Sequence, residues 1–232
     1  MLKHRLSLRG LIERNLYTLM AREGYINIVI ALGLTLILTT ISFFTDGSLY
    51  WKIPSMISGV LLLFTLYFFR DPEREVQVDS NHILSPGDGV IVDIKEVTDD
   101  FVGEATQITM FLSPLNVHIN RVPISGKISN VTYKYGAFKA AFADDASEVN
   151  EQSVVCMEND QVRVKFAQVA GALARRIINY LREDDEVVQG DRYGLIKFGS
   201  RMDVIIPRSA VIQVALKEPV RGGLTILAKL GA

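Results

Sequence analysis

Two long stretches without charge constrain this chain of 232 residues more than any other feature. The first runs from Gly24 to Thr45 and the second from Ile53 to Phe69. A helix that crosses the hydrocarbon core of a bilayer needs about 17–25 mainly apolar residues, so the first stretch is long enough and the second is at the short limit. The link between them, Thr45 to Lys52, is short and suits a tight hairpin turn. The sequence therefore predicts a two-helix membrane anchor.

Two other interpretations of these stretches stay open at this stage. The first stretch could belong to a cleaved signal peptide, but the charged region before it is unusually long and no A-x-A-like site follows Phe44. The second stretch could be a buried helix of a soluble domain. Aromatic residues near its ends, Trp51 and Tyr67, suit a membrane interface and favour the anchor.

Basic residues flank the two stretches unevenly. The link between the stretches carries only Lys52, whereas basic residues stand before the first stretch and after the second: Lys3, Arg5, Arg9, Arg14 and Arg22, then Arg70 and Arg74. The excess of positive charge marks the cytoplasmic side, so both ends of the hairpin are expected there. We expect residues 1–70 to form a basic segment and membrane anchor, and residues 71–232 a domain on the cytoplasmic side of the cell (inner) membrane.

After Pro72 the pattern changes to short runs rich in β-branched residues, separated by Gly, Pro, Asn or Asp. Seven such runs predict strands, at 90–97, 107–112, 127–135, 153–158, 162–170, 202–207 and 210–216. Only segment 172–184 has clear helical spacing, with apolar residues on one face at Leu173, Ile177, Tyr180 and Leu181. We expect a mainly β (α+β) domain with barrel-like or sandwich-like hairpins, preceded by the transmembrane helical hairpin.

Charge and cysteine content exclude several classes of function. The chain has 25 Lys and Arg against 26 Asp and Glu, and this near-neutral balance argues against a nucleic-acid partner. The single cysteine, Cys156, excludes an internal disulfide framework and a zinc site built from cysteines. The three histidines, His4, His82 and His118, are too scattered along the chain to suggest a metal centre.

A glycine–serine pair between two strand-like runs, Gly199-Ser200, is the most informative short piece. In a tight turn the serine hydroxyl can attack the preceding carbonyl, because glycine offers no side-chain obstruction and tolerates a strained backbone. The resulting ester can eliminate across the serine Cα–Cβ bond, which breaks the chain and leaves a dehydroalanine. Hydrolysis of the dehydroalanine, with loss of ammonia, then gives an N-terminal pyruvoyl group. Gly-Ser is also a common turn dipeptide, and a second one stands at Gly47-Ser48, so the pair alone decides nothing.

Five motifs that follow one another along the chain give this pair a context. They are FFRDPERE (68–75), ILSPGDGVI (83–91), FLSPLNVHINRVPISGKI (111–128), VKFAQVAGALARRI (164–177) and GLIKFGSRMDVIIP (194–207). Together they resemble the phosphatidylserine decarboxylase family. The overall length and the FGS ending resemble the short branch of that family, which includes archaetidylserine decarboxylases.

The resemblance implies a proenzyme that cleaves itself between Gly199 and Ser200. The products would be a large β chain, 1–199, and a small α chain, 200–232, which stay associated. Ser200 would become a covalent pyruvoyl cofactor, and neither pyridoxal phosphate nor a metal would be needed. The amine of a membrane phospholipid would form a Schiff base with this group. The lipid would then lose CO₂ from its serine headgroup and be released as the ethanolamine lipid.

Three further residues receive roles from the same resemblance. His118, in NVHINRVP, is the expected catalytic acid or base. Asp88, in PGDG, corresponds to a family aspartate that assists self-cleavage by orienting a base. Longer members carry His-x-x-His in this region, but Arg121 stands at the second position here, so a complete Asp–His–Ser relay cannot be transferred to this chain. Either His118 serves Ser200, or Asp88 acts with water or backbone groups.

Arg121 is instead a candidate for binding the lipid phosphate or carboxylate through paired hydrogen bonds. Phosphatidylserine is the expected substrate and archaetidylserine the alternative, and a homo-oligomer is compatible with either. A different class of function is also open, a membrane-anchored barrel module that acts as an adaptor without enzymatic activity. Such a module would stay in one piece, whereas the enzyme would split at Gly199-Ser200.

Overall fold

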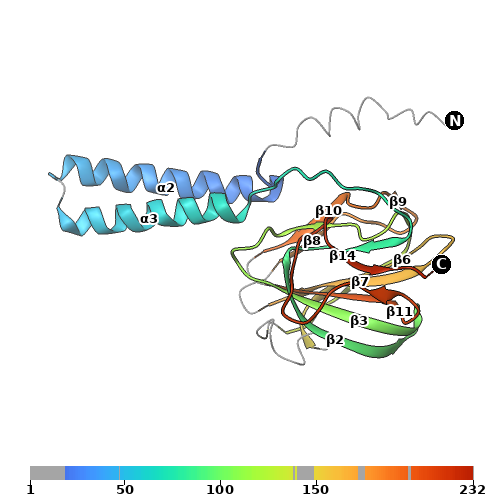
Figure 1. The fold of residues 1–232 in the computed structure, drawn as a ribbon. Coiled ribbons are helices and arrows are strands. Elements are labelled where there is room, and N and C mark those ends of the chain that lie inside the picture. Colours follow the sequence, from blue (N-terminus) through green and yellow to red (C-terminus); the bar gives the residue numbers. More distant parts are fainter. Residues whose placement is uncertain are drawn as a thin grey trace. The chain divides into compact units, whose positions relative to one another are not determined.

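The computed structural model describes residues 19–46, 48–137, 139, 149–171, 176–197 and 200–231. The chain divides into two compact units, residues 1–73 and residues 74–232 (Figure 1). Four basic residues of the predicted N-terminal segment, Lys3, Arg5, Arg9 and Arg14, lie outside the described residues. For these four positions, the prediction of the orientation of the anchor is therefore based on the sequence alone.

Two long helices dominate the described part of the first unit. Helix α2 spans Tyr25–Phe44, after the short 3-10 turn η1 (Arg22–Gly24), and helix α3 spans Leu49–Phe68. Both are long and apolar enough to cross a membrane, with mean hydropathies of 2.2 and 1.5, and only 6% of each apolar window is buried. A core helix of a soluble domain would be mostly buried, so these helices do not behave as one. This confirms the apolar helical pair in front of the β domain.

Contacts in the middle and at the open end hold the two helices side by side (Figure 1). Thr39 Oγ1 and Ser55 Oγ share a hydrogen bond of 2.9 Å in the middle. At the open end, the N–H of Ala21 donates to the carbonyl of Phe69 at 2.7 Å. Gly24 lies so close to the Phe69 ring that a Cβ at Gly24 would be 2.3 Å from its Cγ atom. The helix pair therefore closes only because residue 24 has no side chain.

The second unit is built from antiparallel strands. Across its described residues they form one eight-stranded sheet, in the order β13–β2–β3–β11–β7–β6–β5–β9, and two three-stranded sheets, β4–β10–β8 and β1–β14–β12. The strands of the large sheet are β2 (Gly89–Asp99), β3 (Gly103–Leu112), β5 (Gly126–Lys134), β6 (Gln152–Glu158), β7 (Arg163–Ala170), β9 (Glu186–Val187), β11 (Ser200–Pro207) and β13 (Pro219–Val220). Those of the small sheets are β1 (His82–Leu84), β4 (Ile119–Arg121), β8 (Ile177–Asn179), β10 (Arg192–Ile196), β12 (Val211–Ile212) and β14 (Ile226–Lys229).

Strand β11 lies in the middle of the large curled sheet, between β3 and β7 (Figure 1). Its alternate residues Met202, Val204 and Ile206 are fully buried in the main apolar core. The same core contains side chains from both small sheets, including Ile83 of β1 and Ile196 of β10. The small sheets therefore cover one face of the large sheet, and the residues of β11 that point to this face are shielded from solvent.

The structure corrects two predictions made from local patterns. The helix predicted over 172–184 is wrong in its described part, because residues 177–179 form β8 and pair with β10. A Cβ at Gly194 of β10 would lie 2.0 Å from the carbonyl oxygen of Ile178, so the missing side chain allows this close pairing. The predicted strand 210–216 is reduced to the two residues of β12. The other six predicted strands are confirmed to within four residues at each end.

Candidate active site

Ser200 is the first residue of β11 and is fully buried. It pairs with Leu112 of β3 on one side and with Ala170 of β7 on the other. Strand alternation puts its side chain on the core face, together with that of Met202. Its Oγ atom has no hydrogen-bond partner among the described residues. Buried hydroxyls without a partner are rare in proteins and need an explanation such as a chemical role.

His118 lies directly before β4, and only 2% of its surface is exposed. Its Nδ1 atom is 3.0 Å from the backbone oxygen of Asn116. A carbonyl oxygen can only accept a hydrogen bond, so this contact assigns the proton of the neutral ring to Nδ1. The Nε2 atom then has a lone pair with which to take up a proton. The contact therefore prepares His118 to act as a base.

Asn120 brings the segments of His118 and Ser200 together. It stands two residues after His118, and its Nδ2 atom donates to Met202 Sδ, two residues after Ser200, at 3.1 Å. Two residues of extended chain span at most about 7 Å. Both predicted catalytic residues therefore lie within a short distance of one buried contact, although 82 positions separate Asn120 from Met202.

Gln168 of β7 is a buried polar residue to which no sequence motif assigned a role. Its Nε2 atom donates to Asn120 Oδ1 at 2.8 Å and to the carbonyl oxygen of Ile178 at 3.2 Å. Its Oε1 atom has no partner among the described residues. Gln168 alternates with Ala170, the neighbour of Ser200, so both side chains point to the core face. A polar residue at a core-facing position of the run VKFAQVA was the signal that could have identified it.

Asp88 lies in a buried ion pair with Arg74. Arg74 Nη1 is 2.6 Å from Asp88 Oδ1, and Arg74 Nη2 is 2.8 Å from Asp88 Oδ2. The backbone N–H of Gly222 also donates to Oδ1, at 2.8 Å. Both carboxylate oxygens are thus engaged by partners that can only donate. Paired hydrogen bonds of this type between a guanidinium and a carboxylate are strong and geometrically specific.

Arg121 is also buried, with 4% of its surface exposed. Its Nη1 atom donates to the carbonyl oxygen of Gly190 at 2.9 Å, and its backbone N–H donates to the carbonyl oxygen of Pro86 at 2.8 Å. A Cβ at Gly223 would lie 2.8 Å from Arg121 Cδ. Arg121 therefore packs between the loop of Asp88 and the turn at Gly223. Its binding of a phosphate or carboxylate stays a prediction.

Gly87 is the point at which these segments meet. A Cβ at Gly87 would lie 2.8 Å from Met202 Sδ and 3.5 Å from Asn120 Nδ2. The PGDG loop that holds Asp88 therefore lies directly against the strands next to Ser200 and His118. Gly199, the other half of the predicted cleavage site, lies outside the described residues.

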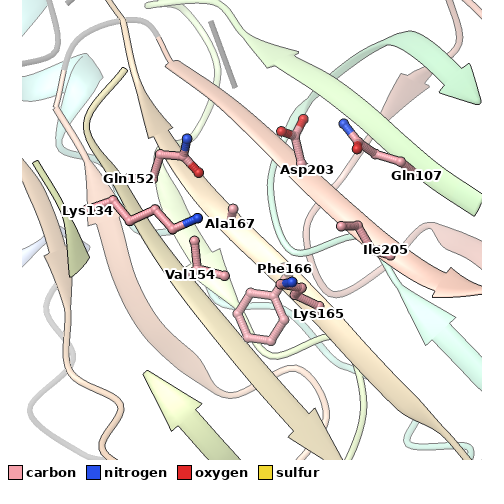
Figure 2. Close-up of a pocket in the computed structure, with 9 residues that line it drawn as sticks. All are labelled: Gln107, Lys134, Gln152, Val154, Lys165, Phe166, Ala167, Asp203 and Ile205. Atoms are coloured by element: carbon pink, nitrogen blue, oxygen red, sulfur yellow. The ribbon is translucent and has the colours of Figure 1, made fainter. Parts of the chain in front are cut away.

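A separate cavity of about 160 Å³ opens on the other face of the large sheet. Figure 2 shows side chains from neighbouring strands around it, among them Gln107, Lys134, Lys165 and Asp203. Asp203 is three residues after Ser200 on β11, so the two side chains point to opposite faces. This cavity therefore does not contain the Ser200 hydroxyl.

Comparison with known proteins identifies a family. Residues 61–228 match the family model for phosphatidylserine decarboxylase. Curated relatives named phosphatidylserine decarboxylase proenzyme include one from Pelodictyon phaeoclathratiforme, 43% identical over 78% of this chain and 86% of the relative. One from Amoebophilus asiaticus is 47% identical over 76% of this chain and 80% of the relative. One from Trichlorobacter lovleyi is 39% identical over 92% of this chain and 97% of the relative.

Proposed function

Because the chain belongs to the phosphatidylserine decarboxylase family, we propose that it cleaves itself at Gly199-Ser200 and then decarboxylates phosphatidylserine to phosphatidylethanolamine. The enzyme is a carboxy-lyase whose cofactor is a pyruvoyl group made from its own chain. The observation that carries the proposal is the buried Ser200 hydroxyl without a described partner, at the start of the central strand. The proenzyme names of the relatives support the cleavage step.

The surroundings of Ser200 fit the formation of a pyruvoyl group. Attack of Oγ on the Gly199 carbonyl, followed by elimination, transfers this oxygen to the new carboxylate of Gly199 and leaves dehydroalanine at position 200. Water then hydrolyses the dehydroalanine to the pyruvoyl group, and its nitrogen leaves as ammonia. The reaction thus removes Ser200 Oγ, the buried side-chain atom that has no hydrogen-bond partner among the described residues. The neighbours on β3 and β7, Leu112 and Ala170, are apolar and buried, so they shield the group from water. Once formed, a pyruvoyl group supplies the electron sink that decarboxylation of an amino acid headgroup requires.

His118 is the proposed base for Ser200 and the proposed acid that returns a proton to the substrate carbon. The hydrogen bond from Nδ1 to the Asn116 carbonyl leaves Nε2 as the atom that takes and gives the proton. Asp88 is proposed to assist self-cleavage without accepting the serine proton, because Arg74 and Gly222 occupy its oxygens. Arg121 is kept as the candidate that binds the phosphate or carboxylate of the headgroup.

The apolar helices associate the chain with a membrane, where its lipid substrate resides. We assign residues 1–70 to the anchor and residues 71–232 to the decarboxylase domain. The basic residues around the helices support a cytoplasmic location for that domain at the inner membrane. The mature enzyme would consist of chains 1–199 and 200–232, which strand pairing keeps together, and a homo-oligomer of this unit is compatible with the same arrangement.

The names of the relatives favour phosphatidylserine over archaetidylserine as the substrate. The two lipids share the same serine headgroup and differ in the apolar chains and their linkage. The chemistry at Ser200 would be the same for both. Both lipids are therefore included in the test.

Intact-mass analysis of the purified full chain in detergent tests the proposal. We expect two fragments, the smaller one of 33 residues with a pyruvoyl group in place of Ser200. The Ser200→Ala variant should stay in one piece, whereas the Ser209→Ala variant, which changes an exposed serine of the same fragment, should split normally. CO₂ release from each lipid then measures decarboxylation. A wild-type chain that stays whole would overturn the proposal and favour the adaptor.

A further inference from the structure

Arg74, Asp88 and Gly222 form a closed cluster, which we call the clamp. Besides its two bonds to Asp88, Arg74 donates through Nη1 to the carbonyl oxygen of Gly222 at 2.5 Å. Gly222 returns its own N–H to Asp88 Oδ1 at 2.8 Å. The side chains of Arg74 and Asp88 are only 8% and 11% exposed. The clamp therefore binds both backbone groups of one glycine in a place with little access to water.

The clamp joins the two chains that self-cleavage would create. Arg74 and Asp88 belong to residues 1–199, whereas Gly222 lies in residues 200–232, 134 positions after Asp88. Neighbouring backbone bonds extend the junction, because the N–H of Gly223 donates to Ser85 and the N–H of Ser85 donates to Thr225, both at 2.8 Å. The PGDG loop is thus bound along its length to the turn at 222–225.

The junction reaches the predicted catalytic residues through direct packing. A Cβ at Gly222 would lie 3.1–3.2 Å from backbone atoms of Gly87, so the two backbones are in contact. Gly87 in turn lies against Met202 and Asn120. These two residues stand two positions after Ser200 and His118, and the hydrogen bond between them joins the two segments. A shift of the clamp would therefore move Gly87, and Gly87 would in turn displace the Asn120 and Met202 side chains that form this hydrogen bond.

We propose that the clamp is the device that sets Ser200 against His118 for self-cleavage, and that Arg74 is a positioning residue for this step together with Asp88. The inference rests on the proposed function and deepens it. Asp88 contributes by holding Arg74 and Gly222, since its two oxygens are engaged by these donors. Self-cleavage therefore requires the Asp88–Arg74 pair and not Asp88 alone. Removal of either residue should slow self-cleavage to the same extent.

The test compares self-cleavage of the full chain in detergent for Arg74→Met, Asp88→Asn and the double variant. Asp88→Asn keeps the shape of the side chain, Arg74→Met keeps only the unbranched stem, and each change removes one charge of the pair. We expect both single variants to cleave about 10²-fold more slowly, the scale expected for a shift of about 1 Å at a reacting centre. We expect the double variant to be no slower than the slower single variant, because both changes break the same contact. Rates are read from the fraction of intact chain by mass spectrometry.

Two further measurements separate positioning from a general loss of stability. Arg74→Lys keeps the charge and one hydrogen bond, and it should recover part of the cleavage rate lost in Arg74→Met. The pH dependence of cleavage should keep its shape in Arg74→Met and Asp88→Asn, because the base is unchanged. Rates are compared at a temperature at which each variant is folded by circular dichroism. Arg208→Met, which breaks an exposed ion pair with Glu96 and Glu104, is the matched control and should cleave at the wild-type rate.

The outcomes distinguish this inference from the proposed function. If the wild-type chain cleaves and Ser200→Ala does not, the proposed cleavage stands whatever the clamp variants do. The inference fails if folded Arg74→Met cleaves at the wild-type rate while Asp88→Asn does not cleave. It also fails if Asp88→Asn changes the shape of the pH profile and Arg74→Met does not. If Arg74→Met does not fold, Arg74→Lys decides alone, and a wild-type rate in that variant together with slow cleavage in Asp88→Asn contradicts the clamp.

Discussion

The two units of this protein use the same apolar residue types in opposite ways. In the helix pair, Val29 and Ile30 are 67% and 65% exposed, whereas Ile108 and Val204 of the β domain are fully buried. The first arrangement is stable only where the surroundings are themselves apolar, and the second is stable in water. An apolar segment is therefore expected to be buried inside the protein only if water, and not an apolar environment, surrounds it.

Polar side chains follow the same division. In α2, Thr35 Oγ1 donates to the carbonyl of Ala31 four residues earlier, at 2.8 Å, so its helix satisfies it locally. In the β domain, Asn120 and Gln168 bond to each other across 48 positions and leave Gln168 Oε1 without a described partner. Unsatisfied polar atoms are costly in any dry environment. The difference indicates that the helix pair satisfies its polar side chains locally, whereas the β domain keeps buried polar groups that depend on distant segments.

The largest expected effect separates catalysis from attachment. We expect His118→Ala to slow self-cleavage and, per cleaved chain, to lower decarboxylation about 10²–10⁴-fold, the usual contribution of general acid–base catalysis. The helix pair is unchanged in this variant, so the chain should remain in the membrane fraction. Lipid turnover and membrane flotation measure the two properties. His82→Ala, which changes a partly exposed residue of β1, is the control, and normal CO₂ release from His118→Ala would contradict the assigned role.

An intermediate effect compares one substitution in the two units. Ile108→Ala removes a fully buried side chain from the core and should lower the free energy of unfolding of the β domain by about 2–5 kcal/mol. Ile30→Ala changes an exposed position of α2 and should leave that free energy unchanged. Pulse proteolysis of the full chain in urea and detergent reports on the domain. An equal decrease in the free energy of unfolding in the two variants would contradict the contrast between buried side chains in the β domain and exposed side chains in the helix pair.

The smallest effect concerns charge within the β domain. Burial by itself would raise the pKa of Asp99, but hydrogen bonds from Lys165 and from the N–H groups of Phe101 and Val102 outweigh it and lower the pKa below 3.8. The ionised form of Asp99 therefore stabilises the fold at neutral pH, and this contribution disappears as the pH falls below 3.8 through the lowered pKa.

Lys165→Met should consequently cost about 1 kcal/mol of the free energy of unfolding at neutral pH and little in acid. The Lys165 and Asp99 side chains are only 24% and 9% exposed, and the variant loses the hydrogen bond between them. Urea unfolding at several pH values measures the difference. Lys95→Met removes a longer and more exposed contact to Asp93 and should have less effect at every pH. A loss that grows toward acid would refute the assigned direction of the Asp99 shift.

Local sequence pattern predicted much of this fold, and its failures have a common cause. The runs that became β2, β3, β5, β6, β7 and β11 are rich in β-branched and aromatic residues. Segment 172–184 has helical spacing, yet residues 177–179 are a strand. Pairing with β10 decides this, and it depends on the missing side chain of Gly194, fifteen or more positions away. Helical periodicity is a local signal, and tertiary pairing overrides it.

The candidate site shows the same limit. The motifs predicted Ser200, His118 and Asp88 as site residues, and comparison with relatives established the family. No pattern pointed to Arg74 as the partner of Asp88 or to Gly222 as the third member of the clamp. Gln168 was visible as a polar residue in an apolar run, but only its place beside Asn120 relates it to the site.

By itself, the sequence determined the uncharged helical segments, the strand-rich character of the remainder and the family, because these depend on residue type and order along the chain. The tertiary structure alone decided which residues meet: Asn120 with Met202, Asp88 with Arg74 and Gly222, and Ser200 with a buried face. These contacts join residues from 14 to 134 positions apart. Their formation depends on the packing of whole sheets, which no short segment specifies.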